Sequence, residues 1–64
     1  MQDWQQRVVD EKAELCERLA KLRQFRQTAE FAAMESDDRS LMEKQAEYMQ
    51  EYADILGRRI ARFK

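Results

Sequence analysis

The 64-residue chain lacks proline and histidine, and it contains only one glycine, Gly57, and one cysteine, Cys16. Without proline, and with a single glycine, nothing interrupts a helix over long stretches, which predicts an all-α chain. The absence of histidine removes the usual serine and cysteine triads and the commonest metal ligand. One cysteine permits neither an internal disulfide nor a thiolate zinc site, so Cys16 is interpreted as a small apolar helix residue. We therefore expect no catalytic residues, no metal site and no cofactor.

The charge is nearly balanced, with 12 Lys and Arg against 13 Asp and Glu. Such a balance is not typical of proteins that bind DNA or RNA polymers or membrane surfaces, although it is compatible with a small anionic ligand. No apolar run approaches the roughly 20 residues of a membrane span, and residues 1–4 do not resemble a signal peptide. The expected location is the cytoplasm.

Two long helices and a short one are predicted from apolar spacing and from capping residues. The first helix covers residues 3–27, where apolar residues recur at helical spacing and opposite charges lie four residues apart. The second long helix covers 37–62, and Ser36 is predicted to cap it. Between them, a short helical turn is expected over 29–33.

The short connection determines how the two long helices are arranged. Thr28 is the predicted N-cap of the helical turn, and Phe31 is expected to fold back over this end. Since a connection this short forces the long helices to run antiparallel, residues 1–64 should form a single helical-hairpin domain. Trp4 should then lie near Phe63 at the opposite end.

Two apolar stripes lie side by side on the second long helix. An inner stripe steps by four and three residues and consists of Met42, Ala46, Met49, Ala53, Leu56, Ile60 and Phe63. An outer stripe consists of Leu41, Tyr48, Tyr52 and Ile55, and Gln45 and Arg59 fill its gaps. A face this wide needs two neighbouring helices, and the hairpin supplies only one. The pattern therefore predicts a homo-oligomeric helical bundle of the coiled-coil kind.

Charged residues interrupt the expected seam of the first helix. The spacing that aligns Val8 with Leu15 also aligns Trp4 with Glu11 and Arg18, so two charges fall where apolar residues are expected. One interpretation is a buried ionic network that fixes the register. The other is a polar pocket between subunits, in which arginine binds phosphate and aromatic rings stack on a base. The candidate ligand-binding residues are Trp4, Glu11, Arg18, Gln45, Tyr48, Tyr52 and Arg59.

Gly57 lies inside the second predicted helix, where glycine costs about 1 kcal/mol relative to alanine. Two interpretations stay open for it. It is either a tolerated surface residue or a place where another backbone or a ligand comes close.

Three segments resemble a known family. They are Gln6-Arg7-Val8-Val9-Asp10-Glu11-Lys12-x-Glu14-Leu15, then Phe31-x-x-Met34 before an acidic turn, then Gln45-x-x-x-Met49-x-x-Tyr52-x-x-Ile55-Leu56-x-x-Arg59-Ile60. They are similar to a family of small phage proteins named after a product of a crAss-like gut phage. The similarity covers nearly the whole chain and implies a helical hairpin of phage origin. Met34-Glu35-Ser36 departs from the Leu-Pro of many relatives, which softens the turn.

In size and hairpin design, the chain also resembles phage sponges that sequester the cyclic oligonucleotide signals of CBASS immunity, and the hairpin part of some Thoeris inhibitors. This likeness implies an oligomer in the host cytoplasm that binds a cyclic oligonucleotide or a cyclic ADP-ribose type of signal without cleaving it. None of the sponges' binding residues aligns by motif. Two alternatives are an inhibitor that binds a host defence protein, and a small structural or regulatory phage subunit.

Overall fold

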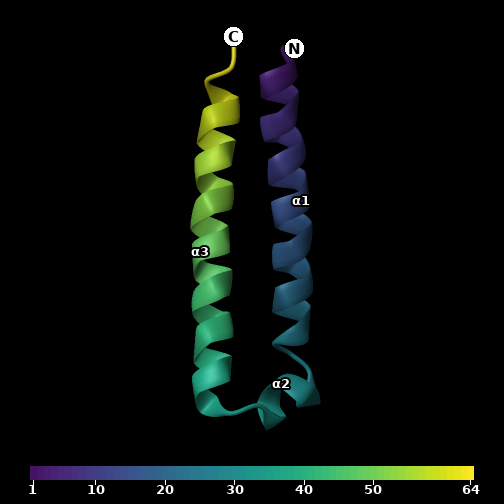
Figure 1. Ribbon diagram of the computed structural model, residues 1–64, viewed down its shortest axis with the longest axis vertical. Helices are drawn as coiled ribbons and strands as arrows, with labels where there is room; N and C mark the ends of the chain where they lie inside the picture. The colour runs from purple at the N-terminus through teal and green to yellow at the C-terminus, as the bar shows by residue number, and fades with distance from the viewer.

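The computed structural model describes residues 1–64 and contains three helices and no strands. Helix α1 spans Asp3–Phe25, α2 spans Ala29–Ala33 and α3 spans Ser36–Ala61. The two long helices lie side by side and antiparallel, with both termini at one end and α2 at the other (Figure 1). The resulting rod measures 47 × 14 × 13 Å. The structure therefore confirms the all-α helical hairpin.

The ends of the long helices differ by one or two residues from the prediction. Helix α1 ends at Phe25, two residues before the predicted end, and a turn follows. Helix α3 begins at Ser36, because the backbone is extended only as far as Glu35, which occupies the cap position without a side-chain hydrogen bond. The prediction that Ser36 caps this helix is wrong, since Ser36 is its first helical residue.

Helix α2 closes one end of the hairpin. The Thr28 hydroxyl accepts a hydrogen bond from the Phe31 backbone N–H at 3.2 Å and donates one to the Phe25 carbonyl at 2.7 Å. The Phe31 ring is buried and meets the Phe25 ring edge to face, with centroids 6.1 Å apart. The N-cap role of Thr28 and the folding back of Phe31 are both confirmed.

A second aromatic pair closes the other end of the hairpin. The Trp4 and Phe63 rings meet edge to face, with centroids 5.1 Å apart, as the antiparallel arrangement predicted. Pairs of this geometry contribute about 0.5–1.5 kcal/mol beyond the area that they bury. The Trp4–Phe63 pair therefore joins the two arms of the hairpin at the terminal end, whereas the Phe25–Phe31 pair joins α2 to the end of α1.

The inner stripe of α3 forms the core of the hairpin. Val8 and Leu15 of α1 pack with Ala53 and Leu56 of α3, and Leu56 is only 1% exposed. Every residue of the inner stripe is buried or half-buried. The prediction that the first long helix covers the inner stripe and not the outer one is confirmed.

Helix α1 presents a different row to this core from the one predicted. The residues that face α3 are Gln5, Val8, Lys12, Leu15, Leu19 and Leu22, all buried or half-buried. Glu11 and Arg18 are exposed and belong to no ion pair. The spacing in the sequence predicts that Trp4, Glu11 and Arg18 face α3 together with Val8 and Leu15. Because Leu15 and Leu19 are the buried leucines of α1, the row that faces α3 is instead Gln5, Lys12 and Leu19, each one residue later in the sequence. The hairpin therefore contains no buried network of Glu11 and Arg18.

We expect Leu15→Ala and Arg18→Ala to differ sharply in their effect on stability. Removing the buried leucine should lower the free energy of unfolding by about 2–5 kcal/mol through lost burial and a cavity. Removing the exposed arginine should change it by less than about 0.5 kcal/mol. Urea unfolding followed by circular dichroism measures both. An equal loss in the two variants would show that Arg18 is buried after all.

The close neighbour of Gly57 is a side chain of α1. A Cβ placed on Gly57 would lie 3.5 Å from Nζ and 3.6 Å from Cε of Lys12, which is ordinary van der Waals contact. The Lys12 side chain therefore crosses α3 at this position. Neither a second backbone nor a positive φ requires glycine here.

Gly57→Ala should therefore stabilise the hairpin. Alanine gains up to about 1 kcal/mol over glycine inside a helix, and the contact with Lys12 permits the added methyl group. Thermal unfolding should show a Tm higher by a few degrees. Ala13→Gly, an exposed position on α1, is the matched control and should lower Tm by a similar amount. A lower Tm for Gly57→Ala would mean that Gly57 meets a neighbour beyond this chain.

Candidate functional site

The outer stripe of α3 is exposed over its whole length. Leu41 and Tyr48 are each 65% exposed, Ile55 is 53% exposed and Tyr52 is 43% exposed. Helix α1 covers the inner stripe only, because one helix cannot reach both faces. The predicted excess of apolar width on α3 is therefore present, and it leaves a row of large side chains open.

A shallow, mainly apolar groove runs along this stripe. Its lining residues all come from α3 and are Leu41, Lys44, Gln45, Tyr48, Met49 and Tyr52. The helical spacing of three and four residues places these side chains in two adjacent rows, and the groove lies between them. The Gln45 amide lies along the helix, with Nε2 3.9 Å from the Met49 sulfur.

The groove combines aromatic faces with one cation. The Tyr48 and Tyr52 rings offer flat surfaces on which a planar ring can stack, and their hydroxyls can donate or accept hydrogen bonds. Lys44 adds three N–H donors and a positive charge. This set can hold a flat, partly apolar, anionic molecule. It contains no nucleophile paired with a base.

Arg18 lies at the level of Tyr52 on the same flank of the hairpin. Two contacts show which residues of α1 and α3 lie at the same height along the rod. Arg23 donates a hydrogen bond to the Gln50 side chain at 2.6 Å, and the Lys12 side chain lies against Gly57. Arg18 lies between these two levels. Arg23 and Gln50 meet on one side of the hairpin. The helical spacing between Arg18 and Arg23 places Arg18 on the opposite side, which is the side of the outer stripe. Arg18 borders the groove without lining it.

Glu11 and Arg59 share the next level of the same flank. Glu11 precedes Lys12, which crosses Gly57, and Arg59 follows Gly57 by two residues. Both side chains are exposed, and no ion pair within 4.0 Å joins them. The single ion pair of the chain joins Lys21 to Glu17 on the surface of α1, at 3.4 Å. Glu11 and Arg59 are therefore open to a ligand or to a partner.

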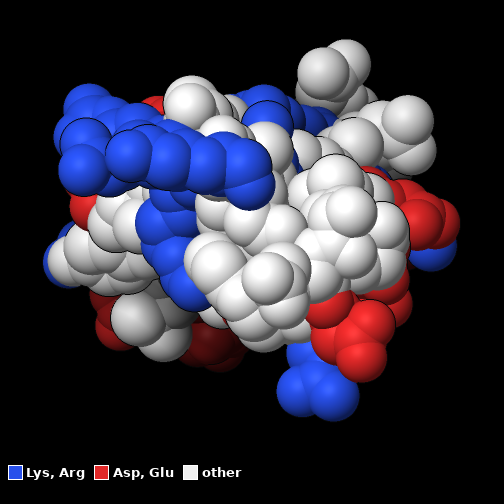
Figure 2. Space-filling model, turned by 90° about the horizontal axis from the view of Figure 1, so that it is seen from above, with Lys and Arg blue, Asp and Glu red and all other residues white.

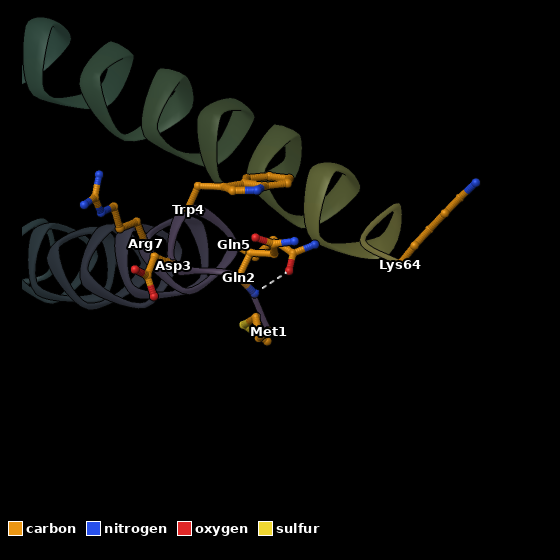
Figure 3. Close-up of a pocket in the computed structure, with 7 residues that line it drawn as sticks. All are labelled: Met1, Gln2, Asp3, Trp4, Gln5, Arg7 and Lys64. Carbon is orange, nitrogen blue, oxygen red and sulfur yellow. Dashed lines mark hydrogen bonds between the residues drawn. The ribbon is translucent and has the colours of Figure 1, made fainter.

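Trp4 is separated from the other candidate residues. It lies at the level of Phe63, about 16 Å from Tyr52 along α3 at roughly 1.5 Å per residue. It lines a depression at the termini, with Met1, Gln2, Asp3, Gln5, Arg7 and Lys64. Figure 3 shows the Trp4 indole against the end of α3, the Gln2 backbone N–H bound to the Gln5 side chain, and Lys64 pointing away.

The end-on view shows the surroundings of this depression. Uncharged residues occupy the middle of this end, and charged side chains of both signs surround them (Figure 2). Trp4 is thus part of the aromatic closure of the hairpin. The structure does not bring it to the tyrosine groove of α3.

Lys44 is a groove residue that the sequence reasoning missed. It lies three residues after Leu41 and four before Tyr48, and this spacing by itself places it beside the outer stripe.

No group of three or more Cys, Asp or Glu side chains is arranged to hold a metal ion. No helix has both the length and the apolar character needed to cross a membrane.

Comparison with known proteins identifies one family. The family model described as Sequestin matches residues 2–62, which include both long helices and the connection between them. No curated protein and no solved structure matches the chain significantly.

Proposed function

The chain belongs to the Sequestin family, and we propose that it is a phage anti-defence protein that binds and sequesters a host nucleotide signal without cleaving it. The family name points to a sequestering role and to binding in place of catalysis. The signal is of the cyclic oligonucleotide or cyclic ADP-ribose type. The observation that carries the proposal is the tyrosine-lined groove that α1 leaves open on α3.

The chemistry of the groove suits the two parts of a nucleotide. A base has a flat aromatic face, which can stack on Tyr48 or Tyr52. Phosphate oxygens can accept hydrogen bonds from Lys44 in the groove, and from Arg18 and Arg59 at its border. Base and phosphate would thus be bound on one flank of the hairpin. The balanced net charge of −1 favours a small anion over a polymer.

The proposed sequestering unit is a homo-oligomer of hairpins in the host cytoplasm. A groove on one helix is open to water on most sides, and a second hairpin placed against the outer stripe would turn it into a cleft. The same contact would bury the remaining exposed surface of the leucine, isoleucine and tyrosine side chains, and complete burial of a leucine or isoleucine that starts fully exposed is worth roughly 1.5–3 kcal/mol. Burial of the stripe and enclosure of the ligand are then one event.

The assembly has a direct test in solution. Light scattering after size exclusion should give a mass at least twice that of the 7.8 kDa chain at micromolar concentration. Tyr48→Glu and Ile55→Glu should each shift the mass toward that of one chain, because both place a charge in the outer stripe. Ala13→Glu, an exposed position of α1, is the control and should leave the mass unchanged. A helical monomer for the unaltered protein would contradict the assembly.

Nucleotide binding is tested by calorimetry against cyclic dinucleotides, cyclic trinucleotides and cyclic ADP-ribose variants. One class should bind tightly and be recovered intact after heat denaturation, and binding should weaken as salt rises because the contacts are ionic. Arg18→Ala and Arg59→Ala should each weaken binding about tenfold or more. The matched controls are Arg23→Ala and Arg26→Ala on the other flank, which should have little effect.

The nucleotide result depends on the oligomeric state, so each variant is compared at the same measured mass. Equal weakening by all four arginine changes would point to general charge and not to the groove. No binding by any signal of these classes would contradict the proposed function.

The exposed apolar stripe also favours a second candidate, an inhibitor that docks on a host defence protein. An uncovered row of large apolar side chains is a feature of protein interaction sites. Such an inhibitor would co-purify with one host protein at a fixed ratio and would release no nucleotide. A small structural or regulatory phage subunit would instead co-purify with phage components.

A further inference from the structure

A row of four charged residues borders the outer stripe on the side away from α1. Asp37, Lys44, Glu51 and Arg58 follow one another at intervals of seven residues, and their charges alternate in sign. All four side chains are exposed. Because seven residues make nearly two helical turns, they form a slightly slanted line that follows Leu41, Tyr48 and Ile55, which have the same spacing. We call this line the charged row.

Two copies of the charged row that run in opposite directions bring opposite charges together. In this arrangement Asp37 of each copy meets Arg58 of the other, and Lys44 of each copy meets Glu51 of the other, so all four contacts pair an acidic with a basic side chain. We propose that a second copy of the chain docks on the outer stripe with its α3 antiparallel, around a two-fold axis close to Tyr48. Asp37 then pairs with Arg58 of the partner subunit, and Lys44 pairs with Glu51 of the partner subunit.

The antiparallel direction follows from which rows can meet. In a two-fold antiparallel pair of helices, the row that borders the interface on one side faces the same row of the partner. In a parallel pair, equal levels face each other, so Asp37 would stand at the level of another Asp37 and Arg58 at the level of another Arg58. The first arrangement forms four attractive contacts, whereas in the second the two charged rows lie on opposite sides of the interface and form none of them.

The distribution of charge along α3 and the C-terminal residues that follow it favours the same direction. Residues 36–54 carry six acidic and two basic side chains, whereas residues 55–64 carry four basic and no acidic ones. Antiparallel docking places the acidic part of each copy beside the basic part of the other. It also brings the apolar ends of the outer stripe, Leu41 and Ile55, to similar levels, so the large side chains cover one another.

This arrangement deepens the proposed function and rests on the oligomer that it requires. Around an axis close to Tyr48, the grooves of the two copies face each other. The cleft is then lined by tyrosines from both subunits, and each Lys44 lies at its edge. A ligand with its own approximate two-fold symmetry, such as a cyclic dinucleotide, would meet the same groups from either subunit.

A charge exchange between positions 44 and 51 tests the pairing. Lys44→Glu and Glu51→Lys should each weaken dimerisation about tenfold at low salt, because two attractive contacts per dimer become repulsive. The double variant should restore the dimer, since the new Glu at 44 meets the new Lys at 51 of the partner subunit. Within one chain the two positions are two turns apart, so the rescue reports contact between chains. Analytical ultracentrifugation measures the dissociation constants.

Cross-linking with a short bismaleimide tests the direction independently, in a Cys16→Ser background because Cys16 is exposed. A mixture of Asp37→Cys and Arg58→Cys chains should form a cross-linked dimer, whereas each variant alone should not. Like positions would be about 32 Å apart at roughly 1.5 Å per residue. Cross-linking of Asp37→Cys with itself, or additive losses in the charge exchange, would overturn the antiparallel pairing. An antiparallel dimer that binds no nucleotide would support this inference and contradict sequestration.

Discussion

The packing of the inner stripe of α3 against α1 is the contact on which the rest of the molecule depends. Ala46 and Ala53 are small and almost fully buried, which lets the two helices approach closely, and Leu56 fills the space between them. This contact fixes the rotation of α3 about its own axis. With the inner stripe turned inward, the outer stripe must lie on the flank, where no part of the same chain reaches it. The open groove is therefore a direct consequence of the core.

Aromatic contacts close both ends of the hairpin, and one of them joins its two arms directly. At one end, Thr28 caps α2 and brings Phe31 onto Phe25; at the other, Trp4 meets Phe63. The Trp4–Phe63 contact and the packing of Leu56 against α1 set the levels of the polar residues along the rod. Arg18 lies at the level of Tyr52, and Glu11 at the level of Arg59, although neither arginine takes part in an ion pair within the chain.

The proposed sequestering role requires groups that bind a ligand, and the groove on α3 provides such groups. The groove offers aromatic faces and a cation but no nucleophile activated by a base. A rod with exposed apolar and charged rows on one helix suits association with itself, since every copy presents the same complementary surface. The chain belongs to the Sequestin family, and the proposed ligand site between copies rests on the open groove and on the alternating charges of the charged row.

The sequence by itself determined the helices, their antiparallel pairing and the width of the apolar face, because periodicity, capping residues and the lack of proline act locally. Thr28, Phe31 and the inner stripe were predictable on these grounds. The rotation of α1 was not. Two rows one residue apart fit its spacing almost equally well, and only packing against α3 selected Gln5 and Lys12 over Glu11 and Arg18. The contact of Trp4 with Phe63 was predictable from the antiparallel arrangement, and it places Trp4 away from the tyrosines with which it was grouped as a candidate ligand-binding residue. Levels and rotations depend on how both helices fit together, and that information is absent from either helix alone.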